Sequence, residues 1–176
     1  MDFIGQTKNW IREVVIGCNF CPFAAREVKL DRVRYRVEES AQPAVILKAF
    51  REECERLDRE PEIATTLLIL PKAVGMFRDY LDLLGRAEKS LRQGGWAGKY
   101  QVASFHPQYR FAGVDPEDAA NYTNRSIYPM LHLLREADVT KAIAYHTDAE
   151  GIPQRNVDFA RDKGAAYMKA LRDACL

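Results

Sequence analysis

The run IATTLLIL at residues 63–70 shows no alternation of polar and apolar side chains and stops at Pro71. A strand that is covered on one face alternates with period two, whereas a strand that is covered on both faces reads as a continuous apolar run. Residues 63–70 are therefore predicted to form a central strand of a sheet. Residues 32–38, RVRYRVE, do alternate, which predicts a neighbouring strand with one polar face.

A third strand is predicted over residues 100–105, and most of the remaining chain has helical spacing. Apolar residues recur every three or four positions in the other segments, which Pro and Gly residues interrupt. The predicted helices cover residues 3–17, a short stretch after Pro22, residues 43–60, 77–93, 126–134, 139–145 and 153–175.

These elements predict an α+β fold with a three- or four-stranded sheet and helices mainly on one face. The polar face of residues 32–38 favours this class, because a doubly wound sheet would bury both faces of that strand. The alternative is an α/β fold with parallel βαβ crossovers, since each connection exceeds the dozen residues that a crossover needs.

Composition predicts a single globular domain over residues 1–176. The chain has 176 residues, of which 47% are hydrophobic and 29% charged, and its net charge is +1. Such a weak charge provides no field to collect nucleic acid or an anionic membrane, so neither partner is expected. No secretory leader or run of 18 apolar residues is visible, which predicts a cytoplasmic protein with reduced cysteines.

Cys18 and Cys21 form a Cys-x-x-Cys pair, which is typical of metal and redox sites. A structural zinc ion needs four ligands; His106 is a possible third, and no fourth stands out. Cys21 alone is a more specific candidate, because as the N-cap of a helix begun by Pro22 its thiolate would be stabilised by the helix dipole. The alternative is a buried, inert thiol between Phe20 and Phe23.

His106 follows a predicted strand and precedes Pro107, a position from which a sheet can present an acid or base at its rim. Its alternative role is a strand-end imidazole bonded to backbone. His132 lies inside an apolar run and is interpreted as a core or boundary residue, and His146 as a solvated one.

The segment NYTNRS at residues 121–126 predicts an anion site. Free N–H groups at the start of the expected helix, the Ser126 hydroxyl and the Arg125 guanidinium would bind phosphate or carboxylate. The alternative is a helix cap in which Arg125 pairs with a nearby acid. The candidate ligand-binding residues are Arg110, Asn121, Tyr122, Asn124, Arg125 and Ser126.

Several motifs resemble those of a bacterial protein family, the domain of unknown function 1415. They are VIG at 15–17 leading into CPFA at 21–24, SFHP at 104–107, NYTNRS at 121–126 and YPMLHLLR at 128–135. The resemblance extends over essentially the whole chain. It implies a stand-alone cytosolic domain and no particular activity, substrate or cofactor.

The sequence leads to three functional hypotheses. The first is a small enzyme that binds an anionic metabolite, with His106 as acid or base and Cys21 as nucleophile. The second is a non-catalytic binding or assembly protein, and the third is a metal-binding protein that uses Cys18, Cys21 and His106. No nucleotide-binding motif and no cofactor are indicated, and the oligomeric state is left open.

Overall fold

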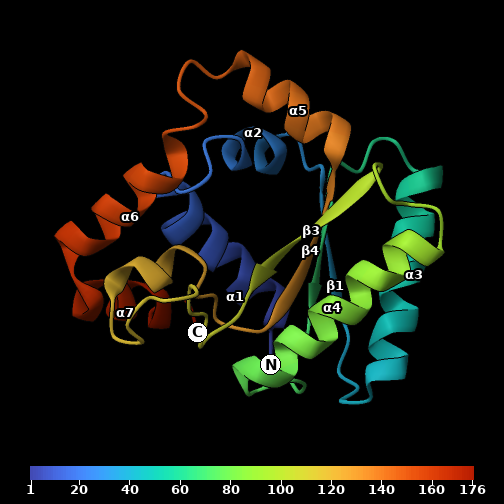
Figure 1. Cartoon of the computed structure of the whole chain (residues 1–176), viewed down its shortest axis with the longest axis horizontal. Helices are drawn as coiled ribbons and strands as arrows, with labels where there is room; N and C mark the ends of the chain where they lie inside the picture. Colours follow the sequence, from blue (N-terminus) through green and yellow to red (C-terminus); the bar gives the residue numbers. More distant parts are fainter.

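The computed structural model describes residues 1–176 and has one four-stranded sheet with helices on both faces (Figure 1). The elements in chain order are α1 (Phe3–Trp10), a π-helix (Ile11–Ile16), α2 (Ala24–Lys29), β1 (Val33–Val37), α3 (Pro43–Arg59), β2 (Thr65–Ile69), α4 (Phe77–Gln93), β3 (Tyr100–Phe105), a 3-10 helix (Ala119–Thr123), β4 (Met130–Arg135), α5 (Glu136–Tyr145), α6 (Ile152–Lys163) and α7 (Ala165–Asp173).

The strand order is β1-β2-β4-β3. β1 and β2 are parallel, and β4 runs antiparallel to both of its neighbours, β2 and β3. The sheet is thus mixed, and the predicted α+β class is confirmed. β2 is buried at all five of its positions, as its unbroken apolar run predicts.

The helices are divided unequally between the two faces. α3 and α4 pack on one face, where Phe50, Tyr80, Leu68 and Leu131 belong to the same buried cluster. The other five α-helices lie on the opposite side of the sheet (Figure 1), where Trp10, Leu67 and Met130 belong to a second cluster. The expectation of helices mainly on one face therefore agrees with the structure.

The polar side of β1 is covered rather than open to water. Arg34 Nε donates to Glu53 Oε2 at 2.7 Å, and Arg36 Nη1 donates to Glu53 Oε1 at 3.2 Å. Glu53 belongs to α3 and is fully buried. The alternating arginines thus anchor α3 to the edge strand, because a buried carboxylate needs opposite charges to offset its lost hydration.

The predicted helix at residues 126–134 is wrong, because its second half forms the central strand β4. β4 is a central strand like β2, and a short, mainly apolar run of this kind is compatible with helix or strand. The predicted helix at 153–175 is interrupted. Gly164, at φ 82°, separates α6 from α7, since this left-handed conformation is one that glycine adopts without strain.

Candidate functional site

A cavity of about 700 Å³ lies between the sheet and the two helices α2 and α5. We call it the α2–α5 cavity. Sixteen of its 27 lining residues are hydrophobic, so its walls are mainly apolar. Its floor is the sheet face opposite to α3 and α4, and its sides come from α2, α5, Trp10 and the π-helix.

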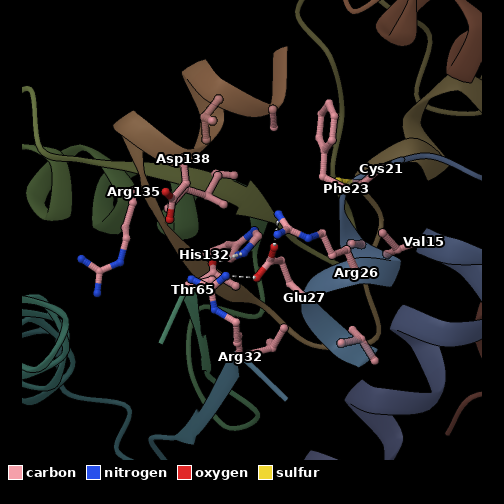
Figure 2. A pocket seen from close by; sticks show the side chains of 18 of the residues that line it. Val15, Cys21, Phe23, Arg26, Glu27, Arg32, Thr65, His132, Arg135 and Asp138 are labelled. Carbon is pink, nitrogen blue, oxygen red and sulfur yellow. Dashed lines mark hydrogen bonds and ion pairs between the residues drawn. The ribbon is translucent and has the colours of Figure 1, made fainter. Parts of the chain in front are cut away.

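The register of the strands places residues of the cavity floor next to one another. Leu67 of β2 and Ala103 of β3 both pair with His132 of β4, so these three side chains lie in one row across the sheet. Thr65 lies two positions before Leu67, and alternate residues of a strand point to the same face. The sheet thus presents Thr65 and His132 side by side to the cavity (Figure 2).

Thr65 and His132 are joined by a hydrogen bond. Thr65 Oγ1 lies 2.6 Å from His132 Nε2 and 2.5 Å from the carbonyl oxygen of Leu133. Burial lowers the pKa of His132 to about 4, because the imidazolium would lose its hydration inside the protein. His132 is therefore neutral at pH 7, with one ring nitrogen protonated and the other free to accept a hydrogen bond.

Aromatic rings continue the floor toward the π-helix. The ring of Phe105 lies 5.9 Å from His132 and 5.2 Å from Trp10, centroid to centroid. Trp10 Nε1 is buried and has no hydrogen-bond partner in the protein. The Trp10 and Phe105 rings meet edge-to-face and the Phe105 and His132 rings are tilted by 36°, so this row forms an aromatic, apolar wall.

A charged group lies on the α2 side of the same cavity. Glu27 forms ion pairs with Arg32 at 3.3 Å and with Arg26 at 3.7 Å, and Figure 2 draws these side chains beside Thr65 and His132. Glu27 Oε2 is buried and accepts no hydrogen bond. Only three buried side-chain polar atoms in the protein lack a partner, and two of them, this one and Trp10 Nε1, belong to residues of this cavity.

Helix α5 covers the cavity without being fixed in the core. It begins directly after β4, and none of its residues is buried. Val139 and Ala142 line the cavity, and the ring of His146 after the helix packs edge-on against Phe23 before α2 at 5.7 Å. The contact between Phe23 and His146 closes one end of the space between α2 and α5.

His106 lies outside this cavity, among buried aromatic rings. It is fully buried, with Phe77 and Tyr80 at centroid distances of 5.3 and 5.1 Å. Its Nε2 donates to the carbonyl of Val74 at 2.9 Å, and its Nδ1 accepts from the amide of Gln108 at 2.9 Å. Both ring nitrogens are occupied, and burial lowers the pKa of His106. The arrangement is that of the strand-end imidazole bonded to backbone.

The predicted anion-binding residues form a structural cluster. Arg125 Nε donates to the carbonyl of Tyr109 at 2.9 Å, its Nη2 donates to the carbonyl of Pro116 at 2.7 Å, and its guanidinium stacks over Tyr122. Asn121 is fully buried and bonds to three backbone groups of the same loop. These contacts occupy the groups that were expected to bind an anion.

Ser126 does not begin a helix, so the expected free N–H groups are missing. Its hydroxyl donates to the carbonyl of Tyr128 at 2.5 Å in the turn before β4. Asn124 donates to the carbonyl of Ser104 at 3.2 Å, and Arg110 is exposed. The premise of a helix N-terminus at Ser126 is therefore wrong.

Cys21 is half-buried and borders two cavities. It lines the α2–α5 cavity and a second one of about 430 Å³, which Asn124 also lines. The prediction that Cys21 is a helix N-cap is wrong, because α2 begins at Ala24 and its N-cap is Phe23. Cys18, also half-buried, has its pKa raised by burial. Whether the Cys21 thiol reacts stays a prediction.

The structure does not assemble the expected site or a metal centre. His106 and Arg125 line neither cavity, so Cys21, His106 and Arg125 do not share one of these hollows. No group of three or more His, Cys, Asp or Glu side chains is placed to hold a metal ion, Cys18, Cys21 and His106 included.

The sequence interpretation missed Thr65, His132 and Glu27. His132 is interpreted from the sequence as a core or boundary residue because it lies inside an apolar run, and the expected helix gave it no relation to Thr65. Once residues 130–135 are taken as a strand, period two puts His132 and Leu134 on one face and Leu131 and Leu133 on the other. Assigning residues 130–135 to a strand is therefore the step that places His132 on the cavity face.

Fold and cavity together define an α+β protein with a large apolar hollow between its sheet and two covering helices. Residues 2–170 match the family described as Protein of unknown function (DUF1415), and the chain belongs to this family. No curated protein and no solved structure matches the chain. Crossing a lipid bilayer would require a longer and more apolar helix than any in this protein.

Proposed function

We propose that the protein binds a small, mainly apolar molecule in the α2–α5 cavity. The observation that carries this proposal is the cavity itself, which is mainly apolar and has a few polar groups in its lining. Its volume of about 700 Å³ is within the roughly 300–1,000 Å³ of natural ligand sites. A concave, mainly apolar hollow of this size is the usual form of a small-molecule site.

Polar groups among the lining residues support a ligand as the occupant of this cavity. Thr65 and His132 of the sheet and the Glu27–Arg32 ion pair on the α2 side are surrounded by mainly apolar residues. Ligand sites typically combine apolar walls with a few polar groups, which orient the bound molecule.

Binding is favoured over acid–base catalysis because of the chemistry of His132. Its pKa of about 4 makes it a good hydrogen-bond acceptor at pH 7 but a weak base. His106 and Arg125 make backbone contacts elsewhere, so their roles as acid and anion ligand lack a shared pocket. Of the three sequence hypotheses, the non-catalytic binding protein has the most support. A cytoplasmic location would keep its four cysteines as free thiols.

The neutral fluorescent probe N-phenyl-1-naphthylamine tests this proposal. We expect saturable binding of one probe per chain, with fluorescence that rises as the probe leaves water. Ala142→Phe, on the cavity side of α5, fills part of the space and is expected to weaken binding at least about tenfold, equivalent to about 1.4 kcal/mol.

Ala144→Phe provides the matched control. Ala144 is on the same helix, is exposed and does not line the cavity, so this variant is expected to bind the probe as the unmodified protein does. Equal binding by both variants, or no saturable binding at all, would exclude the α2–α5 cavity as the ligand site.

A further inference from the structure

We infer that the ligand of the α2–α5 cavity donates a hydrogen bond to Nδ1 of His132, and that Thr65 is the positioning residue that fixes this nitrogen as an acceptor. This inference rests on the proposed function and specifies the class of ligand. That class is apolar molecules with a hydroxyl or N–H group, such as phenols and aryl amines, rather than carboxylates or phosphates.

A proton count on Thr65 sets the tautomer of His132. The Thr65 hydroxyl has one proton, and its oxygen lies 2.5 Å from the Leu133 carbonyl oxygen, which has none to offer. Two oxygen atoms this close share a proton, so Thr65 donates to Leu133. Its contact with His132 Nε2 at 2.6 Å must then run the other way, with Nε2–H donating to Thr65 Oγ1.

The remaining nitrogen of the ring is an unused acceptor. With the proton on Nε2 and the ring neutral, Nδ1 holds a lone pair, and no group of the protein donates to it. His132 is a lining residue and Nδ1 is not among the fully buried unpaired atoms, so it is reachable from the cavity. A ligand hydroxyl or N–H is the complementary group.

The neighbouring charges reinforce this preference. Glu27 Oε2 lies 3.3 Å from Arg32 Nη1 and Glu27 Oε1 lies 3.7 Å from Arg26 Nη1, so both guanidinium groups on this side are already paired with a carboxylate. An anion would meet the His132 acceptor and two guanidinium groups that are already paired with Glu27, and it would also lose its hydration in a mainly apolar space. A neutral donor avoids both costs.

The experiment compares 2-naphthol with 2-methoxynaphthalene, two probes that share the ring system but differ in the donor proton. Dissociation constants are measured by fluorescence at pH 7 for the unmodified protein and for His132→Phe, Thr65→Val and Thr65→Ser. We expect 2-naphthol to bind about tenfold more tightly than its ether to the unmodified protein, the scale of one net hydrogen bond. His132→Phe is expected to abolish that ratio.

The Thr65 variants test the positioning role by a readout that packing alone does not move. Imidazole ¹⁵N spectra of the unmodified protein are expected to show His132 with the proton on Nε2. Thr65→Val removes the hydroxyl at similar volume. In this variant the proton is expected to distribute over both nitrogens of His132, and the preference for 2-naphthol over 2-methoxynaphthalene is expected to fall. Thr65→Ser is expected to restore the spectrum and the ratio.

The outcomes separate this inference from the proposed function. If both naphthalenes bind with equal affinity, or the proton is on Nδ1, the inference is wrong while cavity binding stands, provided that Ala142→Phe still weakens both. If Ala142→Phe affects neither probe, the proposed function itself fails. Should His132→Phe not fold, the ratio and the ¹⁵N spectrum of the unmodified protein still decide.

Discussion

Lowering the pH from 7 to 4 is expected to destabilise the protein through His132 in particular. In the unfolded chain this imidazole protonates near its ordinary pKa of 6.5, whereas burial lowers the pKa to about 4 in the folded protein. Between these values the unfolded state binds a proton that the folded state does not. The free energy of unfolding therefore falls as the pH falls from 6.5 to 4, and this contribution is constant outside that window.

The magnitude follows from the width of the window. Each pH unit between the two pKa values corresponds to about 1.4 kcal/mol, so the interval from 6.5 to about 4 gives roughly 3 kcal/mol. This is a large share of the roughly 5–15 kcal/mol by which small domains are stable. His106 adds an effect of the same sign, because burial also lowers its pKa.

The comparison of the unmodified protein with His132→Phe isolates the contribution of His132. Urea unfolding at a series of pH values between 4 and 8 provides the free energy of unfolding of each, and His106 is present in both. We expect the difference between the two proteins to change by about 3 kcal/mol across the window, in favour of the variant at low pH. Parallel curves would refute the reasoning, since they would mean that His132 is hydrated or charged in the folded state.

Three further predictions concern residues outside the cavity floor. Tyr80→Phe removes a hydroxyl that donates to a β4 carbonyl at 2.7 Å and accepts from a β3 amide at 3.1 Å. Urea unfolding is expected to show that this variant has a free energy of unfolding lower by about 1–3 kcal/mol. Tyr145→Phe, whose side chain is exposed, is the control and is expected to lose no stability. Burial raises the pKa of Cys54 to about 12. Mass-resolved thiol labelling at pH 8 is therefore expected to modify half-buried Cys21 well before Cys54. Equal labelling rates would contradict the burial of Cys54. Arg125→Lys loses hydrogen bonds to backbone carbonyls and is expected to lower the free energy of unfolding by about 1 kcal/mol. It is expected to bind N-phenyl-1-naphthylamine as the unmodified protein does. Weaker binding of the probe by this variant would indicate that Arg125 has a binding role.

The sequence was sufficient for the elements with an unambiguous pattern. The alternation at residues 32–38 and the apolar run at 63–70 predicted β1 and β2, and the helical stripes predicted α3 and α4. These patterns are reliable because the period of the apolar residues matches the geometry of one helix or strand packed in the core. The polar face of residues 32–38 favoured the α+β class over α/β, although the structure covers that face with α3.

β4 could not be predicted because its pattern results from its neighbours. A strand between β2 and β3 is covered on both faces, so it loses the alternation that would identify it, and Ser126 and Pro129 imitate the start of a helix. The same error hid the site, because His132 contacts Thr65 and lines the cavity only as a residue of a central strand. Cys21, His106 and Arg125 were chosen for their chemistry, but burial and backbone contacts across the fold determine what their side chains can do.

A crystal structure of the protein with 2-naphthol tests the central claim most directly. We expect the naphthalene ring between the sheet and helices α2 and α5, with its hydroxyl within hydrogen-bond distance of His132 Nδ1. Density for the compound only at another surface, or a ring in the cavity with its hydroxyl turned away from His132, would contradict the account.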